Sequence, residues 1–123
     1  MKIVMIGAGY VGLVTGACFS DFGFSVICVD KDAGKIDALK EGRIPIFEPG
    51  LADLVARNAS AGRLAFSVEI ASAVREADIV FVAVGTPSRR GDGHADLAYV
   101  YAAAAEIAAE IDSYKVIVIK STV

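Results

Sequence analysis

The sequence predicts one α/β domain with a doubly wound parallel sheet, and three observations lead to this fold class. Apolar runs of strand length at residues 3–6, 26–29 and 79–84 alternate with segments of helical periodicity. A glycine-rich turn follows the first run, and an acidic residue ends the second. Hydrophobic residues make up 55% of the 123 positions and charged residues 22%, which is typical of a buried parallel sheet covered by helices.

The glycine-rich turn is Gly7-Ala8-Gly9-Tyr10-Val11-Gly12, which has the GxGxxG pattern of a Rossmann-type dinucleotide-binding domain. Gly7 is expected to allow the tight turn, Gly9 to let the backbone approach a pyrophosphate, and Gly12 to let the following helix pack closely on its strand. The N–H groups and the positive dipole end of that helix would bind the anion, so the turn needs no lysine.

Asp30 follows the strand at residues 26–29 and lies 18 positions after Gly12, near the spacing expected of a ribose-binding acid. Its carboxylate would accept hydrogen bonds from the ribose hydroxyls of NAD and would repel the 2′-phosphate of NADP. Lys31 argues weakly for NADP and is expected to face solvent. Lys35, in the next helix, either reaches back to the ribose edge or is a solvated surface residue.

The first half of the chain is expected to form a helix after the glycine turn, a second helix at residues 31–41 and a third from residue 51 to about 60. Gly23 and Gly42 would end the first two, and Ile36 and Leu39 would face inward. The apolar positions of the first helix are Val11, Val14, Thr15, Cys18, Phe19 and Phe22. A stiff loop with two prolines, residues 44–50, precedes the third helix and sets this domain apart from a simple Rossmann unit.

The second half is expected to contain a strand at residues 63–67, a short helix at 68–76 and a wholly apolar, central strand at 79–84. Asp96 would cap a long helix, and a last strand would cover residues 115–120. The expected apolar face of the long helix is Leu97, Val100, Tyr101, Ala104, Ile107, Ala108 and Ile111. No helix follows the last strand, so the sequence is expected to be an N-terminal domain or fragment of a longer protein.

Polar residues follow the strands at the edge of the sheet where ligands bind in this fold class. Thr86 follows the central strand and is either a cofactor contact or a turn residue before Pro87. Ser121 and Thr122 follow the last strand at the same edge. His94, the only histidine, lies in a charged turn and is expected to be a surface residue.

Composition excludes several classes of function. The net charge of −3 and the lack of a basic tract argue against nucleic-acid binding. No signal peptide and no apolar run of membrane-spanning length is found, which favours a cytoplasmic protein without a membrane partner. The two cysteines, Cys18 and Cys28, match no metal or redox motif, and both are expected to be buried in the core.

Five stretches together resemble the N-terminal domain of the UDP-glucose/GDP-mannose dehydrogenase family, most closely its bacterial members that act on UDP-glucose. They cover nearly the whole chain in the family's order, and the last three are the specific ones. The stretches are Gly7-Ala8-Gly9-Tyr10-Val11-Gly12-Leu13, Val29-Asp30, Ile46-Phe47-Glu48-Pro49-Gly50-Leu51, Val84-Gly85-Thr86-Pro87 and Lys120-Ser121-Thr122-Val123.

The resemblance implies an enzyme of polysaccharide biosynthesis, a homo-oligomer, that oxidises the C6 alcohol of a nucleotide sugar to a carboxylate in two NAD-dependent steps. It places NAD contacts on Gly7, Ala8, Gly9, Tyr10, Val11, Gly12, Asp30, Lys35, Thr86, Ser121 and Thr122. Thr122 would also lie beside the reacting sugar carbon, as a catalytic residue. The family's essential cysteine and its helpers lie in a C-terminal half, so residues 1–123 alone are expected to be inactive.

Two alternatives remain open from the sequence. GDP-mannose dehydrogenase is the alternative within the family, because the residues that select the sugar lie mostly beyond Val123. A regulatory NAD-binding module, which senses and does not catalyse, is the alternative from another class. The Glu48-Pro49-Gly50 stretch and the Thr86-Pro87 turn argue against that module.

Overall fold

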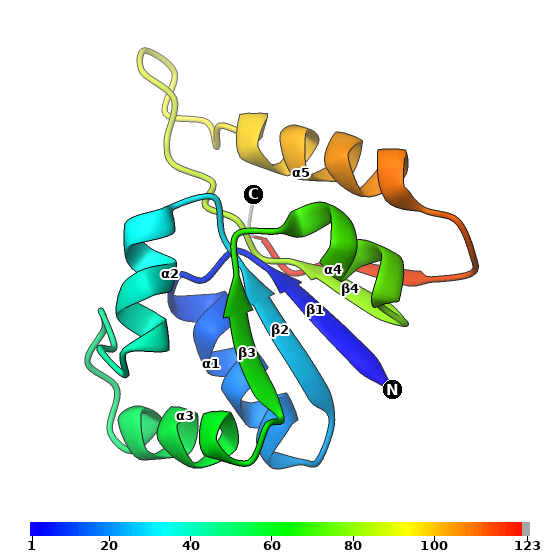
Figure 1. The fold of residues 1–123 in the computed structure, drawn as a ribbon. Helices are drawn as coiled ribbons and strands as arrows, with labels where there is room; N and C mark the ends of the chain where they lie inside the picture. Colours follow the sequence, from blue (N-terminus) through cyan, green and yellow to red (C-terminus); the bar gives the residue numbers. More distant parts are fainter. Residues whose placement is uncertain (122–123) are drawn as a thin grey trace.

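The computed structural model describes residues 1–121, which form a five-stranded parallel sheet with helices on both faces (Figure 1). The strand order is β3-β2-β1-β4-β5, so the doubly wound α/β fold predicted from the sequence is confirmed. The strands are β1 (Lys2–Ile6), β2 (Ser25–Val29), β3 (Leu64–Ser67), β4 (Ile79–Val82) and β5 (Val116–Ile119). The order reverses between β1 and β4, and this switch point is where open α/β sheets bind ligands.

Helices α1, α2 and α3 cover one face of the sheet, and α4 and α5 cover the other (Figure 1). The bounds are α1 (Tyr10–Asp21), α2 (Ala33–Lys40), α3 (Leu51–Ser60), α4 (Ile70–Glu76) and α5 (Ala98–Glu110). Successive side chains of a strand point to opposite faces, so each strand contributes to two cores. Met5 of β1 lies in the core with α1, α2 and α3, and its neighbour Val4 lies in the core with α4 and α5.

Most of the predicted elements are confirmed with shifts of one or two residues at their ends. Ile36 and Leu39 of α2 are buried, and Gly42 follows the helix with a positive φ of 83°. The N-cap of α2 is Asp32, whose side chain accepts a hydrogen bond from the backbone N–H of Lys35 at 3.1 Å. Helix α3 has the predicted start and end, and β4 ends at Val82, two residues earlier than expected.

The prediction for α1 is wrong about which face is buried. The residues that face the sheet are mostly small: Gly12, Leu13, Gly16, Ala17 and Ser20. A Cβ at Gly12 would lie 1.9 Å from the Gly7 carbonyl oxygen. A Cβ at Gly16 would lie 2.8 Å from the Cys28 sulfur. At Gly12 and Gly16 the helix therefore lies too close to the turn and to the sheet for a side chain. Of the predicted apolar positions, Val11, Cys18 and Phe22 are exposed, whereas Val14 and Phe19 are half-buried and pack against the core.

The two cysteines differ in burial. Cys28 of β2 is fully buried, as predicted, but Cys18 of α1 is exposed. The prediction of a buried Cys18 is wrong because the small-residue face of α1, and not its longer apolar side chains, contacts β2. Both thiols are free.

Helix α5 also buries a different face from the predicted one. Its fully buried side chains are Ala103 and Ile107, whereas Tyr101 and Ile111 are 67% and 47% exposed. Ile107 is the one residue of the predicted face that is fully buried in the described part of α5, and it lies with Ala103, one turn before it, in the core that α4 and the sheet share. Leu97, and not Asp96, is the N-cap, but Asp96 accepts a hydrogen bond from the Ala98 N–H at 2.9 Å and so satisfies a donor of the first turn.

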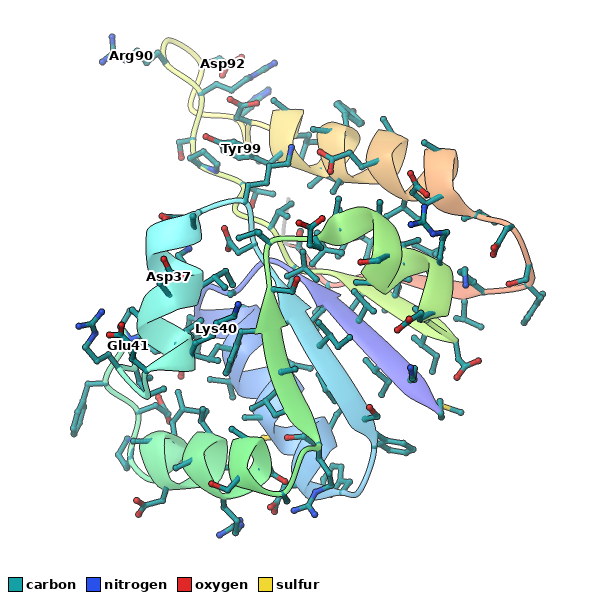
Figure 2. All side chains as sticks on the ribbon, in the orientation of Figure 1. Asp37, Lys40, Glu41, Arg90, Asp92 and Tyr99 are labelled. Atoms are coloured by element: carbon teal, nitrogen blue, oxygen red, sulfur yellow. The ribbon has the colours of Figure 1, made fainter. Side chains whose placement is uncertain are left out.

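The charged segment between β4 and α5 forms a narrow hairpin that projects from the domain. Ser88 and Ala95 pair across it, and the labelled Arg90 and Asp92 lie near its tip (Figure 2). His94 is a surface residue, as predicted, with its side chain 77% exposed and its Nδ1 atom 4.0 Å from the Asp92 carboxylate. Within the described part of the chain, every helix is too short or too polar to cross a bilayer.

The close contact of α1 with the glycine turn predicts a stability difference between two glycine-to-alanine substitutions. Gly12→Ala should lower the free energy of unfolding by about 1–3 kcal/mol, because the added methyl group meets a backbone carbonyl that cannot move alone. Gly34→Ala in α2 is the matched control. Its Cβ would meet only the Asp32 side chain at 3.4 Å, so the better helix propensity of alanine should stabilise the protein by up to about 1 kcal/mol.

Chemical denaturation of both variants and the parent measures this difference. Equal stability of Gly12→Ala and the parent would contradict the packing described for α1.

Candidate functional site

A pocket of about 510 Å³ opens at the carboxyl ends of β1, β2 and β4, at the switch point of the sheet. The glycine turn forms one wall, and residues 83–85 after β4 form another. Charged side chains after β2 and one side of α5 complete the lining. Tyr99 of α5, labelled in Figure 2, lies on this lining near the start of α2.

The glycine turn has the geometry that a bound pyrophosphate needs. Gly7 has a φ of +105°, and a Cβ there would lie 2.5 Å from the Ala83 carbonyl oxygen, so the turn requires glycine. A Cβ at Gly9 would meet no protein atom within 4 Å, so the backbone at Gly9 faces open space on the pocket side. Helix α1 begins at Tyr10 with no acidic residue in its first turn, so its N-terminus can attract an anion.

Asp30 holds the glycine turn in place. Its Oδ2 atom accepts a hydrogen bond from the Ala8 N–H at 2.9 Å, and its Oδ1 atom accepts one from the Asp32 N–H at 3.0 Å. The side chain is 17% exposed and lines the pocket. Carboxylate oxygens have further lone pairs, so Asp30 can still accept hydrogen bonds from a ligand.

Burial by itself would raise the pKa of the Asp30 carboxyl. The N–H groups of Asp32 and Ala8, and then the Lys35 ammonium, outweigh this effect and hold the pKa below its ordinary value of 3.8. Asp30 is therefore ionised at neutral pH, in the form that accepts hydrogen bonds from hydroxyl groups.

The two lysines near Asp30 both line the pocket. Lys35 donates to the Asp30 Oδ2 atom at 3.4 Å, so of the two predicted alternatives the structure has the one in which Lys35 reaches back to Asp30. The prediction that Lys31 faces solvent holds for most of its side chain, which is 73% exposed. Its ammonium group nevertheless forms an ion pair with Glu106 of α5.

Tyr10 connects the glycine turn to the loop with two prolines. Its hydroxyl donates to the Glu48 Oε2 atom at 2.7 Å, and this bond raises the pKa of Tyr10 above its ordinary value. Tyr10 and Val11 are exposed, and they form the first turn of α1, where backbone N–H groups have no partner within the helix and can bind a pyrophosphate. The hydrogen bond between Tyr10 and Glu48 therefore anchors the loop beside the glycine turn, which forms one wall of the pocket.

The residues predicted after β4 and β5 lie at the same edge of the sheet. The pocket reaches Gly85, and Thr86 is the half-buried residue that follows it. Ser121 donates its hydroxyl hydrogen to backbone carbonyls, with the Val84 oxygen at 2.8 Å and the Val82 oxygen at 3.3 Å. Thr122, predicted as the catalytic residue, lies outside the described residues.

Sequence analysis missed the contribution of the second helical layer to the pocket. Ile70 of α4, and Tyr99 and Glu106 of α5, line it. The helix after a central strand begins near the carboxyl edge of the sheet, so the fold class alone could have placed Tyr99 there. Nothing in the sequence indicated that Glu106, two turns further along, would face Lys31.

The described residues contain neither a nucleophile nor a metal site beside the pocket. Burial raises the pKa of the Cys28 thiol to about 12, so its reactive thiolate form is absent at neutral pH. Within residues 1–121, no three His, Cys, Asp or Glu side chains are grouped so that they could hold a metal ion.

The lowered pKa of Asp30 predicts how acid affects stability. Because the folded-state pKa lies below the ordinary value of 3.8, the ionised group stabilises the fold above that pH, and this contribution is lost as the pH falls through the folded-state pKa. Asp30→Asn should therefore be less stable than the parent by about 1 kcal/mol between pH 5 and 7, and the difference should shrink below pH 4.

Thermal or urea unfolding over this pH range measures the difference. The matched control is Asp37→Asn, on the outer side of α2 (Figure 2), which should stay within about 0.5 kcal/mol of the parent. A gap between Asp30→Asn and the parent that widens in acid would contradict the assignment.

Comparison with known proteins agrees with the geometry of the pocket. Residues 1–123 match the family model described as UDP-glucose/GDP-mannose dehydrogenase family, NAD binding domain. The chain is 68% identical over 123 residues to a UDP-glucose 6-dehydrogenase of Rhizobium meliloti, covering all of this chain and 28% of that protein. It is 56% identical over 122 residues to the UDP-glucose 6-dehydrogenase TuaD of Bacillus subtilis, covering 99% of this chain and 26% of TuaD.

Solved structures show the same relation. A GDP-mannose dehydrogenase from Pseudomonas aeruginosa, solved as a ternary complex, superposes with a TM-score of 0.93 at 39% identity, over 100% of this chain and 29% of that one. A UDP-glucose dehydrogenase from Pyrobaculum islandicum superposes with a TM-score of 0.92 at 39% identity, over 99% of this chain and 29% of that one. The chain thus spans little more than a quarter of the length of these relatives. It belongs to the UDP-glucose/GDP-mannose dehydrogenase family, of which it is an NAD-binding domain.

Proposed function

We propose that this chain is the cofactor-binding part of an enzyme that oxidises UDP-glucose to UDP-glucuronate in two NAD-dependent steps. The observation that carries the cofactor assignment is the ionised Asp30 carboxylate at the pocket wall, hydrogen-bonded to the Ala8 N–H of the glycine turn. The choice of UDP-glucose is supported by the 68% and 56% identity to two UDP-glucose 6-dehydrogenases.

The pyrophosphate of NAD is assigned to the turn of residues 7–12. The open space at Gly9 lets the anion approach the backbone, and the N–H groups at the start of α1, including those of Tyr10 and Val11, bind it. Gly7 and Gly12 contribute by having no side chain, and Ala8 by presenting its backbone to Asp30.

The ribose of the adenosine half is assigned to Asp30, with Lys35 beside it. Lys35 lies 3.4 Å from the Asp30 carboxylate and can donate to a ribose oxygen at the same edge. A 2′-phosphate at this position would face the negative charge of Asp30, so the site favours NAD over NADP. Thr86 and Ser121 are assigned as contacts further along the cofactor, where their segments reach the carboxyl edge of β4 and β5.

NAD held by this site would supply the hydride acceptor for oxidation of the C6 carbon of the sugar. Thr122 is assigned a catalytic part in which its hydroxyl orients water or shares a proton with an acid from another domain. A threonine hydroxyl is a weak acid and a weak base at neutral pH, so its contribution would come from position. The covalent chemistry is assigned to a cysteine outside residues 1–123, because Cys28 is buried and Cys18 lies on a helix away from the pocket lining.

We also infer a cytoplasmic homo-oligomer that acts in polysaccharide biosynthesis. Two free cysteines, one of them exposed, are typical of a protein in a reducing compartment. The oligomeric state and the pathway follow from the family resemblance, as does the expectation that residues 1–123 alone do not oxidise the sugar.

The first experiment tests the cofactor. NAD should bind more tightly than NADP in calorimetric titrations, and Asp30→Ala should weaken NAD binding by about 1–3 kcal/mol, because the ribose hydroxyls lose their acceptor. Asp37→Ala, which removes an exposed carboxylate from the outer side of α2, is the control and should bind NAD like the parent. Equal or tighter binding of NADP by the parent would disprove the role assigned to Asp30.

The second experiment tests the reaction in the full-length protein. UDP-glucose should reduce NAD with a much higher kcat/KM than GDP-mannose, as followed by NADH absorbance. Thr122→Ala should lower turnover by roughly 10- to 1000-fold with nearly unchanged NAD affinity, and Thr122→Ser, which keeps the hydroxyl, should retain most of the activity. If Thr122→Ala instead loses NAD affinity while turnover at saturating NAD stays normal, Thr122 is only a cofactor contact.

A further inference from the structure

An ion pair between Lys31 and Glu106 joins two walls of the pocket. Lys31 lies at the end of β2, directly after Asp30, and Glu106 lies on α5 in the opposite helical layer. Both residues line the pocket, and the Glu106 side chain is only 30% exposed. The pair therefore lies beside the edge where the ribose 2′ position would be.

Both lysines at this edge are paired with carboxylates. Lys35 is paired with Asp30 at 3.4 Å, and Lys31 is paired with Glu106. Two lysines beside a ribose site could bind a 2′-phosphate, because ammonium groups bind phosphate as point charges. A site that selects NAD must therefore keep both ammonium groups from that phosphate.

Asp30 is one of several charged groups that a 2′-phosphate would meet at this edge. Its carboxylate already accepts hydrogen bonds from the Ala8 and Asp32 N–H groups and from Lys35. Of these partners only the Lys35 ammonium carries a positive charge, which offsets part of the negative charge of Asp30. Asp30 pairs with Lys35 and not with Lys31. Lys31 pairs with Glu106 of α5 instead.

We propose that Glu106 is a specificity-determining residue that excludes NADP by holding the Lys31 ammonium away from a 2′-phosphate. The proposal rests on the assignment of this pocket to the adenosine half of NAD. Glu106 would weaken the binding of a 2′-phosphate, whereas Asp30 would bind the ribose hydroxyls. Its effect should therefore appear in NADP affinity and hardly at all in NAD affinity.

A purely structural role for the pair is the competing explanation, and α5 offers a matched control. Glu110, one turn further along α5, pairs with Arg75 of α4 at 2.5 Å and is 26% exposed, close to the exposure of Glu106. This second pair joins α5 to α4 outside the pocket lining. If Glu106 only fastened α5, Glu106→Gln and Glu110→Gln would have similar effects.

The test is calorimetric titration of the full-length protein with NAD and with NADP at low ionic strength, where the effect of surface charges is largest. Glu106→Gln should lower the Kd for NADP by about 3- to 10-fold, because Lys31 becomes free to meet the phosphate, and should change the Kd for NAD by less than about 2-fold. Glu110→Gln should leave both values unchanged.

A double substitution tests whether the gain depends on Lys31, and Glu110→Gln, which changes the net charge by the same amount as Glu106→Gln, controls for a general change in charge. In Glu106→Gln/Lys31→Gln the gain in NADP affinity should be lost, as expected for two residues that act through each other. The proposal is overturned if Glu106→Gln gives no measurable gain for NADP, if the gain persists without Lys31, or if Glu110→Gln gives the same gain. Failure of the unsubstituted protein to bind NAD at all would instead remove the proposed function on which the inference rests.

Discussion

The contact between α1 and the glycine turn is the constraint on which the rest of the structure depends. The Gly7 carbonyl oxygen occupies the space that a side chain at Gly12 would need, so the helix begins almost against the turn. This closeness brings the small-residue face of α1 onto β1 and β2 and directs the N-terminus of α1 towards the carboxyl edge of the sheet. The packing of one core and the location of the anion site thus have a single cause.

Asp30 extends this arrangement from one βα unit to the next. By accepting hydrogen bonds from the Ala8 N–H and the Asp32 N–H, the carboxylate connects the turn before α1 with the segment before α2. The group proposed to bind the ribose therefore also organises the pocket before a ligand arrives. A site shaped in this way loses less conformational entropy on binding than one that must be ordered by its ligand.

Helix α5 has a different relation to the pocket. It lies in the opposite helical layer from α1 and α2 (Figure 1). Two of its residues, Tyr99 and Glu106, line the pocket. Charges at the ribose edge therefore come from both layers, with Asp30, Lys31 and Lys35 on one side and Glu106 on the other. The arrangement of charged side chains at the site therefore depends on the folded domain and not on one sequence motif.

The sequence by itself determined the fold class, the order of the elements, the glycine turn and Asp30. These features depend on local periodicity, on residues that tolerate positive φ and on a short spacing along the chain. The tertiary structure decided which faces of α1 and α5 are buried. Helix α1 lies so close to the glycine turn and to β2 that Gly12 and Gly16 admit no side chain, and α5 buries Ala103 and Ile107 in the core that it shares with α4. The tertiary structure also decided that Cys18 is exposed and that Lys31 meets Glu106, since the latter pairing joins residues 75 positions apart that come together only when α5 crosses the edge of the sheet.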